Sequence, residues 1–596
     1  MKNYKPIFNL SAILLILVSI SLQGDLFAQN PPDLREQYLT PPDEIAEEVL
    51  APRHENILLN DLAPTSEYFL NTTQNRTLSP LSAFSKPYYN LGGLQFNPES
   101  NRDRDFTTGR TIGLQLIESR SGDKVSVDTP ENAGITNATW SPDGTKLAYF
   151  AHFENETHIY VANVNSGRSR KLTRRPVLAT LNTSFEWSGD SQYIFSVLLP
   201  ENRGNEPVEP ATPTTLQVKK TTDKENRLRT YPDLLKGKFE AELLKYHTTG
   251  QLVRIRVDDR RIQSIGSPTM IRNIDPSPSG EQVIVQIMSE PFSYIVPVYN
   301  FGWTEVVWDL NGSKLVELRN SEPREGLSDY EEIENYGRRD VKWRPDGEGL
   351  TLLAKEGEGL EPTRQNDEPN GDEEETESDE ENEKVKDRVI QWVAPFGEDD
   401  MVTVYETEKE MESVSYADNN NLILIEESSS NKDFVYAVYL DDSDTTYAII
   451  DHKSDDFYED PGNLMYTSND LGEAVDRTSD ESSSVFLEGT QYYENYSENA
   501  PRPFIDKMAI RTEEKERIFQ SSEELFENPS AILNDEATEI VISRESANLQ
   551  PDSWLIDLED GNEKKLTSNV DHNEAVTQAR RDRFKVKRAD GFEFWV

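Results

Sequence analysis

Few side chains in this sequence stand in a pattern that could do chemistry. Histidine, the usual proton carrier near neutral pH, occurs six times, and no two copies have the H-E-x-x-H spacing of a zinc site. His152 and His158 flank a predicted hairpin turn, where surface or internally hydrogen-bonded histidines are the simpler interpretation. The absence of cysteine excludes thiol nucleophiles, disulfides and cysteine-ligated metals. The six positions are His54, His152, His158, His247, His452 and His572.

Carboxylates are abundant, with 110 Asp and Glu against 61 Lys and Arg, and the formal net charge is −49. A glycosidase needs two carboxylates at a set separation, but so many acidic residues single out no pair. Residues 366–377 fall near the offsets of a calcium-binding loop, yet the first position is Asn366 rather than Asp. We therefore expect neither a metal nor a cofactor, and predict a disordered acidic loop at about 358–386. The charge also disfavours nucleic acid and anionic membranes as partners, and it is typical of proteins from salty habitats.

A tight turn followed by a short apolar strand recurs along the chain and would position any functional residue. The clearest copy is Trp140–Gly144, a Trp-Ser-Pro-Asp-Gly sequence before apolar residues 147–150. Pro presets the backbone at the start of such a turn, Asp caps it, and Gly takes the left-handed conformation. We therefore interpret Asp143, Asp190 and Asp346 as turn caps rather than catalytic carboxylates. Further copies, some degraded, occupy residues 187–191, 277–280, 343–347, 417–420 and 534–536.

The spacing of these turns indicates a repeat fold. The first four begin at positions 141, 188, 277 and 344, which are 47, 89 and 67 residues apart, and 47 residues is about the length of one propeller blade. Several turns are followed by a hairpin with Gly at its tip, as in residues 159–173, 306–315 and 554–567. The sequence therefore predicts an all-β fold, a β-propeller of seven four-stranded blades.

The ends of the chain suggest further divisions. Lys2 and Lys5 precede an apolar run that ends before a small residue at Ala28, the pattern of a secretory signal peptide over residues 1–28; an uncleaved anchor is the alternative. We expect a lead-in segment at 29–104 and the propeller at 105–578, with helical spacing at 45–50, 231–235 and 239–246. This predicts a periplasmic or secreted protein, with no membrane attachment after signal cleavage.

The last residues have a different character. Two short strands, 584–586 and 592–596, flank a turn at Ala589-Asp590-Gly591, and the chain then stops on an apolar strand. Because an exposed apolar edge is an aggregation hazard, we interpret Val596 as a truncation point and residues 579–596 as the start of another domain.

Several motifs together resemble the prolyl oligopeptidase family of serine peptidases, and within it the glutamyl endopeptidase-like branch. The resemblance extends over nearly the whole of the predicted mature chain, and the order of the motifs makes it specific. The matching segments are 41–52, 81–93, 230–236, 291–297, 458–462 and the terminal Arg588-x-Asp590-Gly591.

The resemblance implies a seven-bladed propeller followed by an α/β-hydrolase domain. In that family the catalytic Ser lies in a G-x-S-x-G elbow, followed by Asp and His. No G-x-S-x-G occurs here, and Gly167-Arg168-Ser169 continues with Arg170 and Lys171. We therefore expect the triad to lie beyond Val596, so that this chain has no catalytic residue, no metal ligand and no substrate-binding residue that the sequence identifies.

Two functions stay open at this point. The first is the substrate-gating propeller portion of a secreted serine peptidase, whose peptide substrates would be cleaved by the missing domain. The branch implies a preference for Glu, which would need a cationic pocket, but the sequence does not single out its arginine. The second is a free-standing periplasmic propeller that binds or scaffolds partners. Whether this chain is itself an enzyme, and its oligomeric state, do not follow from the sequence.

Overall fold

The computed structural model describes residues 41–74, 81–109, 111–211, 231–325, 333–334, 337–359, 385–479, 482–496, 498–582 and 584–596. The predicted signal peptide, the candidate calcium loop and residues 360–384 of the predicted acidic loop lie outside them. The chain divides into two compact units, residues 1–51 and 52–596. In the first unit, α2 (Asp43–Leu50) is the predicted short helix.

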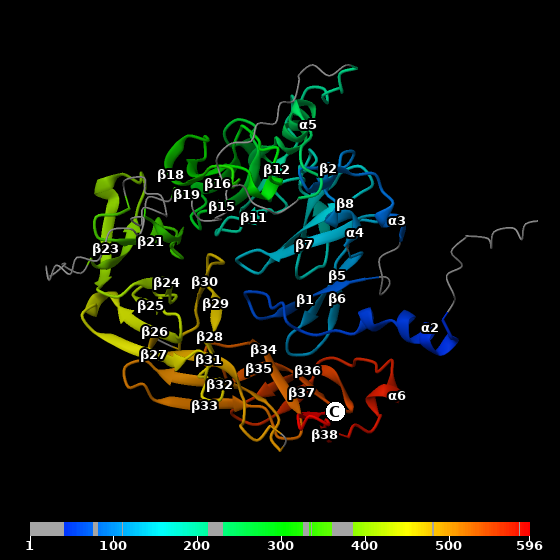
Figure 1. Cartoon of the computed structure of the whole chain (residues 1–596), viewed down its shortest axis with the longest axis vertical. Coiled ribbons are helices and arrows are strands. Elements are labelled where there is room, and N and C mark those ends of the chain that lie inside the picture. Colours follow the sequence, from blue (N-terminus) through cyan, green and yellow to red (C-terminus); the bar gives the residue numbers. More distant parts are fainter. Residues whose placement is uncertain are drawn as a thin grey trace, which may run out of the picture. The chain divides into compact units, whose positions relative to one another are not determined.

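Within residues 52–596 the strands form antiparallel sheets arranged around a ring (Figure 1). We number these sheets as blades 1 to 8 in chain order. Blade 1 contains β1 (Tyr68–Thr73), β5 (Gly113–Glu118) and β6 (Lys124–Ser126); blade 2, β7 (Gly134–Trp140), β8 (Lys146–His152), β9 (Thr157–Asn163) and β10 (Ser169–Lys171); blade 3, β11 (Glu186–Trp187), β12 (Tyr193–Leu198), β13 (Gln251–Arg256) and β14 (Ile262–Ser264); and blade 4, β15 (Ile271–Pro276), β16 (Gln282–Met288), β17 (Trp303–Asp309), β18 (Lys314–Ser321) and β19 (Ile333–Glu334).

The second half of the ring repeats the same up-and-down order. Blade 5 contains β20 (Arg339–Trp343), β21 (Leu350–Lys355), β22 (Asp387–Trp392) and β23 (Met401–Thr407); blade 6, β24 (Met411–Tyr416), β25 (Leu422–Glu427), β26 (Lys432–Tyr439) and β27 (Thr446–Lys453); blade 7, β28 (Asn463–Leu464), β31 (Ser484–Gln491), β32 (Arg502–Ala509) and β33 (Lys515–Gln520); and blade 8, β34 (Phe526–Ile532), β35 (Glu539–Ser546), β36 (Leu549–Asp557) and β37 (Glu563–Lys565).

Smaller elements lie outside the blades. The sheets are β2 (Tyr89–Leu91), β3 (Leu94–Asn97) and β4 (Arg102–Asp103); β29 (Tyr466–Ser468) and β30 (Ala474–Asp476); and the predicted C-terminal pair, β38 (Lys585–Lys587) and β39 (Glu593–Trp595). The helices of the second unit are α3 (Leu81–Phe84), α4 (Asp105–Thr108), α5 (Lys238–Thr248) and α6 (Glu574–Thr577), with single 3-10 turns at Arg53–Glu55, Val298–Asn300, Glu398–Asp400 and Leu440–Asp442. α5 contains the predicted helical segment 239–246, whereas residues 231–235, also predicted from helical spacing, form no helix. None of the helices in the described ranges has the length and apolar character needed to span a bilayer.

Apolar clusters between successive blades hold the ring together. Each cluster combines buried residues of two neighbouring blades, and the series runs from blades 1 and 2 through to blades 7 and 8. A last cluster packs Val541 of blade 8 against Phe69 and Ile117 of blade 1, so the circle is closed. The predicted β-propeller is confirmed. The predicted count of seven blades is not, because eight such sheets lie in the described residues, and β1, from the expected lead-in segment, pairs with β5 in the first of them.

The turns predicted from the sequence recur in every blade. In each, the backbone N–H of the fourth residue donates to the carbonyl of the first at 2.7–3.2 Å, and the fourth residue has a positive φ of 50° to 75°. These fourth residues are Ser66, Gly144, Ser191, Gly280, Gly347, Asn420, Ser482 and Ala537. The predicted caps are confirmed as well: Asp143 Oδ1 accepts from Thr145 N, Asp190 Oδ1 from Gln192 N, and Asp346 Oδ1 from Glu348 N.

The tryptophans that lead two of these turns connect neighbouring blades. Trp140 Nε1 donates to Asp61 Oδ1 at 2.9 Å, and Trp343 Nε1 donates to the carbonyl of Asp275 in blade 4 at 3.0 Å. These two tryptophans therefore satisfy their indole N–H groups on the preceding part of the ring. Trp187, which leads the turn of blade 3, differs, because its Nε1 is buried without a hydrogen-bond partner among the described residues.

Candidate functional site

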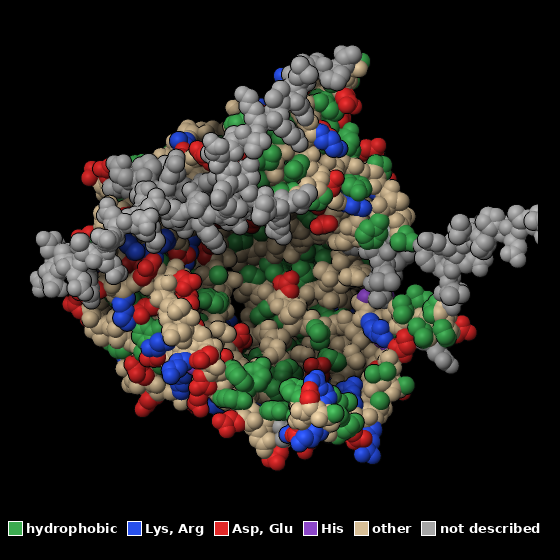
Figure 2. Space-filling model, in the orientation of Figure 1, with side chains coloured by type: hydrophobic (Ala, Val, Ile, Leu, Met, Phe, Trp, Pro, Cys, Tyr) green, Lys and Arg blue, Asp and Glu red, His purple; other side chains and the backbone are tan. Residues whose placement is uncertain are grey.

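The molecule is hollowed at the centre of the ring (Figure 2). The hairpin of β29 and β30, inserted between two strands of blade 7, lies inside the ring (Figure 1). Its tip reaches the turns of other blades: Asn469 Nδ2 donates to the carbonyl of Pro345 in blade 5 at 2.9 Å. A Cβ placed on Gly472 would lie 2.8 Å from Pro142 Cγ, and one placed on Gly189 would lie 3.1 Å from Leu471 Cβ. The hairpin thus occupies part of the space around the central axis of the ring, which we call the axial space.

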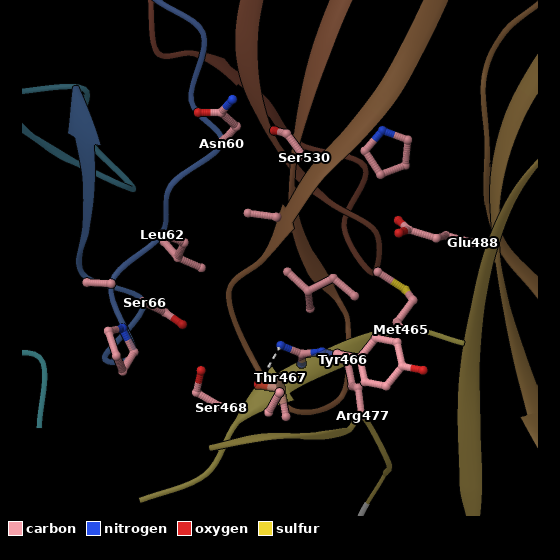
Figure 3. Close-up of a pocket in the computed structure, with 16 residues that line it drawn as sticks. Asn60, Leu62, Ser66, Met465, Tyr466, Thr467, Ser468, Arg477, Glu488 and Ser530 are labelled. Atoms are coloured by element: carbon pink, nitrogen blue, oxygen red, sulfur yellow. Dashed lines mark hydrogen bonds between the residues drawn. The ribbon is translucent and has the colours of Figure 1, made fainter. Parts of the chain in front are cut away.

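A cavity of about 480 Å³ lies between this hairpin and blades 1 and 8 (Figure 3). Hydroxyl and amide groups supply most of its labelled polar lining, from Asn60, Ser66, Thr467, Ser468 and Ser530. Two charged side chains also line it. The guanidinium of Arg477 donates to Thr467 Oγ1 at 3.4 Å, and burial lowers its pKa. On another wall, burial raises the pKa of the Glu488 carboxyl.

Carboxyl groups beside the hairpin retain protons to unusually high pH. Burial, and then the negative charges of Glu473 and Glu186, raises the pKa of Asp275 to about 7. Glu473, in the turn between β29 and β30, also has its pKa raised to about 7 by burial and by Glu186. Asp476, only 1% exposed, has a pKa of about 7 because burial outweighs the nearby Ser415 and Lys342. The charge of the axial space therefore changes around neutral pH.

The histidines named from the sequence do not converge on this site. His152 ends β8, where its ring nitrogens contact the hydroxyls of Thr136 at 2.8 Å and Thr157 at 2.9 Å. His158 Nδ1 contacts Thr173 Oγ1 at 2.8 Å, and burial lowers the pKa of His158. Both flank the predicted hairpin turn and are internally hydrogen-bonded. In the described ranges, no group of three or more His, Asp and Glu side chains is placed to hold a metal ion.

Neither Arg477 nor the carboxyls beside the hairpin, Asp275, Glu473 and Asp476, are predicted as site residues from the sequence. Local sequence carries no signal for them, because their burial results from a hairpin that crosses the ring to meet blades far away in the chain.

The fold defines the class of protein: a β-propeller whose axial space is partly filled by its own hairpin. No family model matches the chain. It is 26% identical over 586 residues to a probable chloroplastic glutamyl endopeptidase of Oryza sativa subsp. japonica, an alignment that covers 93% of this chain and 59% of the relative. The corresponding protein of Arabidopsis thaliana is 26% identical over 589 residues, covering 93% of this chain and 58% of that one.

The resemblance to the glutamyl endopeptidase-like branch, inferred from the motifs, is thereby confirmed. The chain spans somewhat less than 60% of the length of these relatives. Among solved structures, the β-propeller domain of the trilobed protease from Pyrococcus furiosus superposes with a TM-score of 0.31 at 11% identity, covering 74% of this chain and 100% of that one.

Proposed function

We propose that this chain is the propeller portion of a serine peptidase that hydrolyses peptides, with a preference for glutamyl residues. The observation that carries the proposal is the alignment with two probable glutamyl endopeptidases over 93% of this chain. Bond cleavage would proceed by acyl transfer in an α/β-hydrolase domain following the propeller, with Ser as nucleophile and His as base. No residue described here takes a catalytic role in the proposal.

The part played by the propeller would be selection of substrates by size. The β29–β30 hairpin occupies part of the axial space, and a cavity of about 480 Å³ admits a short peptide segment but not a folded domain. Extended peptides would therefore reach the catalytic domain, whereas folded proteins would be excluded.

A fluorophosphonate probe tests the catalytic assignment. The purified 596-residue chain should not be labelled, because the proposal places the nucleophilic serine outside it. The product of the gene read beyond codon 596 should be labelled and should cleave quenched peptides that contain Glu faster than matched peptides with Gln. Labelling of the 596-residue chain, or a stop codon directly after Val596, would contradict the proposal, and the second result would favour a free-standing binding protein.

We further propose that the protein is exported and that residues 1–28 are removed. The charged start and apolar run of that segment support the proposal. Expression of the full coding sequence, followed by N-terminal sequencing of the periplasmic or secreted fraction, should give a chain beginning near Gln29. A chain that stays membrane-bound with Met1 or Lys2 at its start would count against export by cleavage.

A further inference from the structure

Two arginines of blade 4 converge on one backbone carbonyl. Arg272 Nη2 and Arg324 Nη2 point to the carbonyl oxygen of Tyr299, at 3.4 Å and 3.3 Å, and Arg272 Nη1 lies 3.5 Å from the carbonyl oxygen of Phe301. These separations are longer than the usual 2.7–3.2 Å of such bonds. Among the described residues, neither guanidinium has a carboxylate within ion-pair distance.

Some other partly buried arginines of the chain have such partners. Arg544 Nε lies 2.7 Å from Glu527 Oε1, and Arg319 Nε lies 2.6 Å from Glu305 Oε2. Others, such as Arg203 and Arg388, have no carboxylate partner among the described residues, but their guanidiniums reach backbone carbonyls at 3.1 Å and 3.0 Å. Both distances are shorter than those from Arg272 and Arg324 to the carbonyl oxygen of Tyr299. Burial and the charge of Arg324 lower the pKa of Arg272, so bringing the two together costs free energy that an anion would recover.

Unsatisfied donors gather at the same place. Within the part of the chain that the structure describes, Arg324 Nε is buried without a hydrogen-bond partner, and so is Asn300 Nδ2, on a residue that is only 4% exposed. Asn300 adjoins Tyr299, and its carbonyl accepts from the backbone N–H of Arg324 at 2.9 Å. Because all the unpaired groups are donors, the group that would satisfy them is an acceptor. The carboxylate of the adjacent Glu325 is already bound by the hydroxyl of Ser293.

A cavity of about 300 Å³ adjoins Arg272. Arg272, Gln286 and Tyr299 give it a polar side, and its other lining residues are Gly92, Gly93, Leu94, Leu181 and Val298. Gly92 allows close packing here, since its φ is +59° and a Cβ would lie 3.0 Å from Val298 Cγ2. Tyr299 is 57% exposed, so this lining residue also reaches solvent.

The motifs that carried the family resemblance build this region. Leu91 of β2, Leu235 from segment 230–236, and Phe292 and Val296 from segment 291–297 pack in one apolar cluster with α5 and Phe301. Segments far apart in the sequence thus meet beside the arginine pair, which none of the motifs contains.

We propose that Arg272 and Arg324 form a carboxylate-binding site for peptides. The inference deepens the function proposed above and rests on it for the identity of the ligand as a peptide. The two guanidiniums match the two oxygens of a carboxylate, while the apolar wall and Tyr299 would contact the rest of the peptide. The carboxylate belongs either to an acidic side chain or to the peptide C-terminus.

Binding to the purified 596-residue chain tests the site without any catalytic step. Fluorescein-labelled, C-terminally amidated peptides containing one Glu or one Gln are compared by anisotropy at fixed ionic strength. A third peptide has Gln and a free C-terminus. We expect the Glu peptide to bind at least roughly tenfold more tightly than its Gln counterpart if the side chain is the ligand, since a charge-assisted pair is lost with Gln. Tighter binding of the third peptide would support the C-terminus instead.

Variants then assign the residues. R272Q and R324Q should each weaken binding of the Glu peptide much more than binding of the amidated Gln peptide, so that the discrimination between them is lost, and R272K should retain part of the discrimination. The matched control is R261Q, which removes an equal charge from an arginine whose side chain is 82% exposed. Thermal melting confirms that each variant is folded.

Two outcomes would overturn the site. One is equal affinity of the wild-type chain for all three peptides. The other is a loss in R272Q and R324Q that is the same for charged and uncharged peptides, which indicates a purely structural role. Because no cleavage is measured, carboxylate-selective binding that persists when the extended gene product fails to label would refute the peptidase proposal but not this site.

Discussion

Asn569 holds the backbone of Ile57 with both ends of its side-chain amide. Its Oδ1 accepts from Ile57 N and its Nδ2 donates to Ile57 O, each at 2.8 Å, although the residues are 512 positions apart. Asn56 and Val570 form a second reciprocal pair, with both distances at 2.9 Å. The four strands described for blade 8 all come from residues 526–565, so these bonds and the cluster around Phe69 close the ring.

We expect N569A to destabilise the propeller by about 2 kcal/mol, since several backbone groups lose a partner at a partly buried position. Urea unfolding followed by tryptophan fluorescence gives the change in free energy. N562A is the control, because Asn562 is exposed in the same blade. Equal stability of N569A and wild type would show that the apolar cluster alone closes the ring.

The raised pKa of Glu473 predicts a dependence of stability on pH. A carboxyl that holds its proton to about pH 7 when folded, and to about pH 4 when unfolded, makes the folded state bind more protons between these values. The stabilisation of the folded state by this proton is therefore fully present below about pH 4 and is lost as the pH rises to about 7.

The substitution E473Q removes the ionisable carboxyl, so the fall in stability between about pH 4 and pH 7 that Glu473 causes should disappear. We expect the variant to be more stable than wild type at pH 8, on the order of 1 kcal/mol, and to differ much less at pH 5. Melting temperatures at the two pH values provide the measurement, with E559Q, at an exposed glutamate of blade 8, as control. An equal gain at both pH values would argue against titration as the cause.

The contact between Gly472 and Pro142 predicts that the hairpin can be displaced by a single methyl group. Gly472 has a φ of +82°, and a Cβ there would lie 2.8 Å from Pro142 Cγ. G472A should increase amide hydrogen exchange in residues 466–476. Gly561 is the matched control, because its φ is +69° but nothing lies within 4 Å of its Cβ position. Equal effects of G561A and G472A on global stability, with no local change in exchange, would contradict the contact.

The net charge of −49 predicts that salt stabilises the fold. Screening of like charges should raise the melting temperature between about 0.05 M and 1 M NaCl, with most of the rise at the lower concentrations, where the Debye length changes most. A melting temperature that is constant over this range would remove the support for a salty habitat.

The sequence predicted the parts of the fold that are encoded locally. Six of the eight turns are predicted from their Pro, Asp, Asn or Gly residues and from the apolar strand that follows each of them. The turns ending at Ser66 and Ser482 are not predicted, because serine occupies their left-handed position and neither has the Trp-Ser-x-Asp pattern that marks the turn ending at Ser191. Because the turn ending at Ser66 is not predicted, β1 is assigned to the lead-in segment. The sequence therefore predicts seven blades, whereas the described residues contain eight sheets.

The site was less predictable for a physical reason. Glu473 is one acidic residue among 110, and only its position between β29 and β30, beside turns from the far side of the ring, shifts its pKa. Arg272 and Arg324 are separated by 52 residues and meet only through the fold of blade 4. Whether a charged side chain has an ion-pair partner depends on its neighbours in the folded chain, so it cannot be read from the spacing of residues along the sequence.

The hairpin of β29 and β30 also has a mechanical consequence. In linear repeat proteins each unit touches only its neighbours, so unfolding can spread from one end. Here the hairpin inserted in blade 7 contacts the turns of blades 2, 3 and 5 across the ring. Loosening one blade therefore disturbs the opposite side, and the propeller should melt as one unit, without stable intermediates missing a single blade.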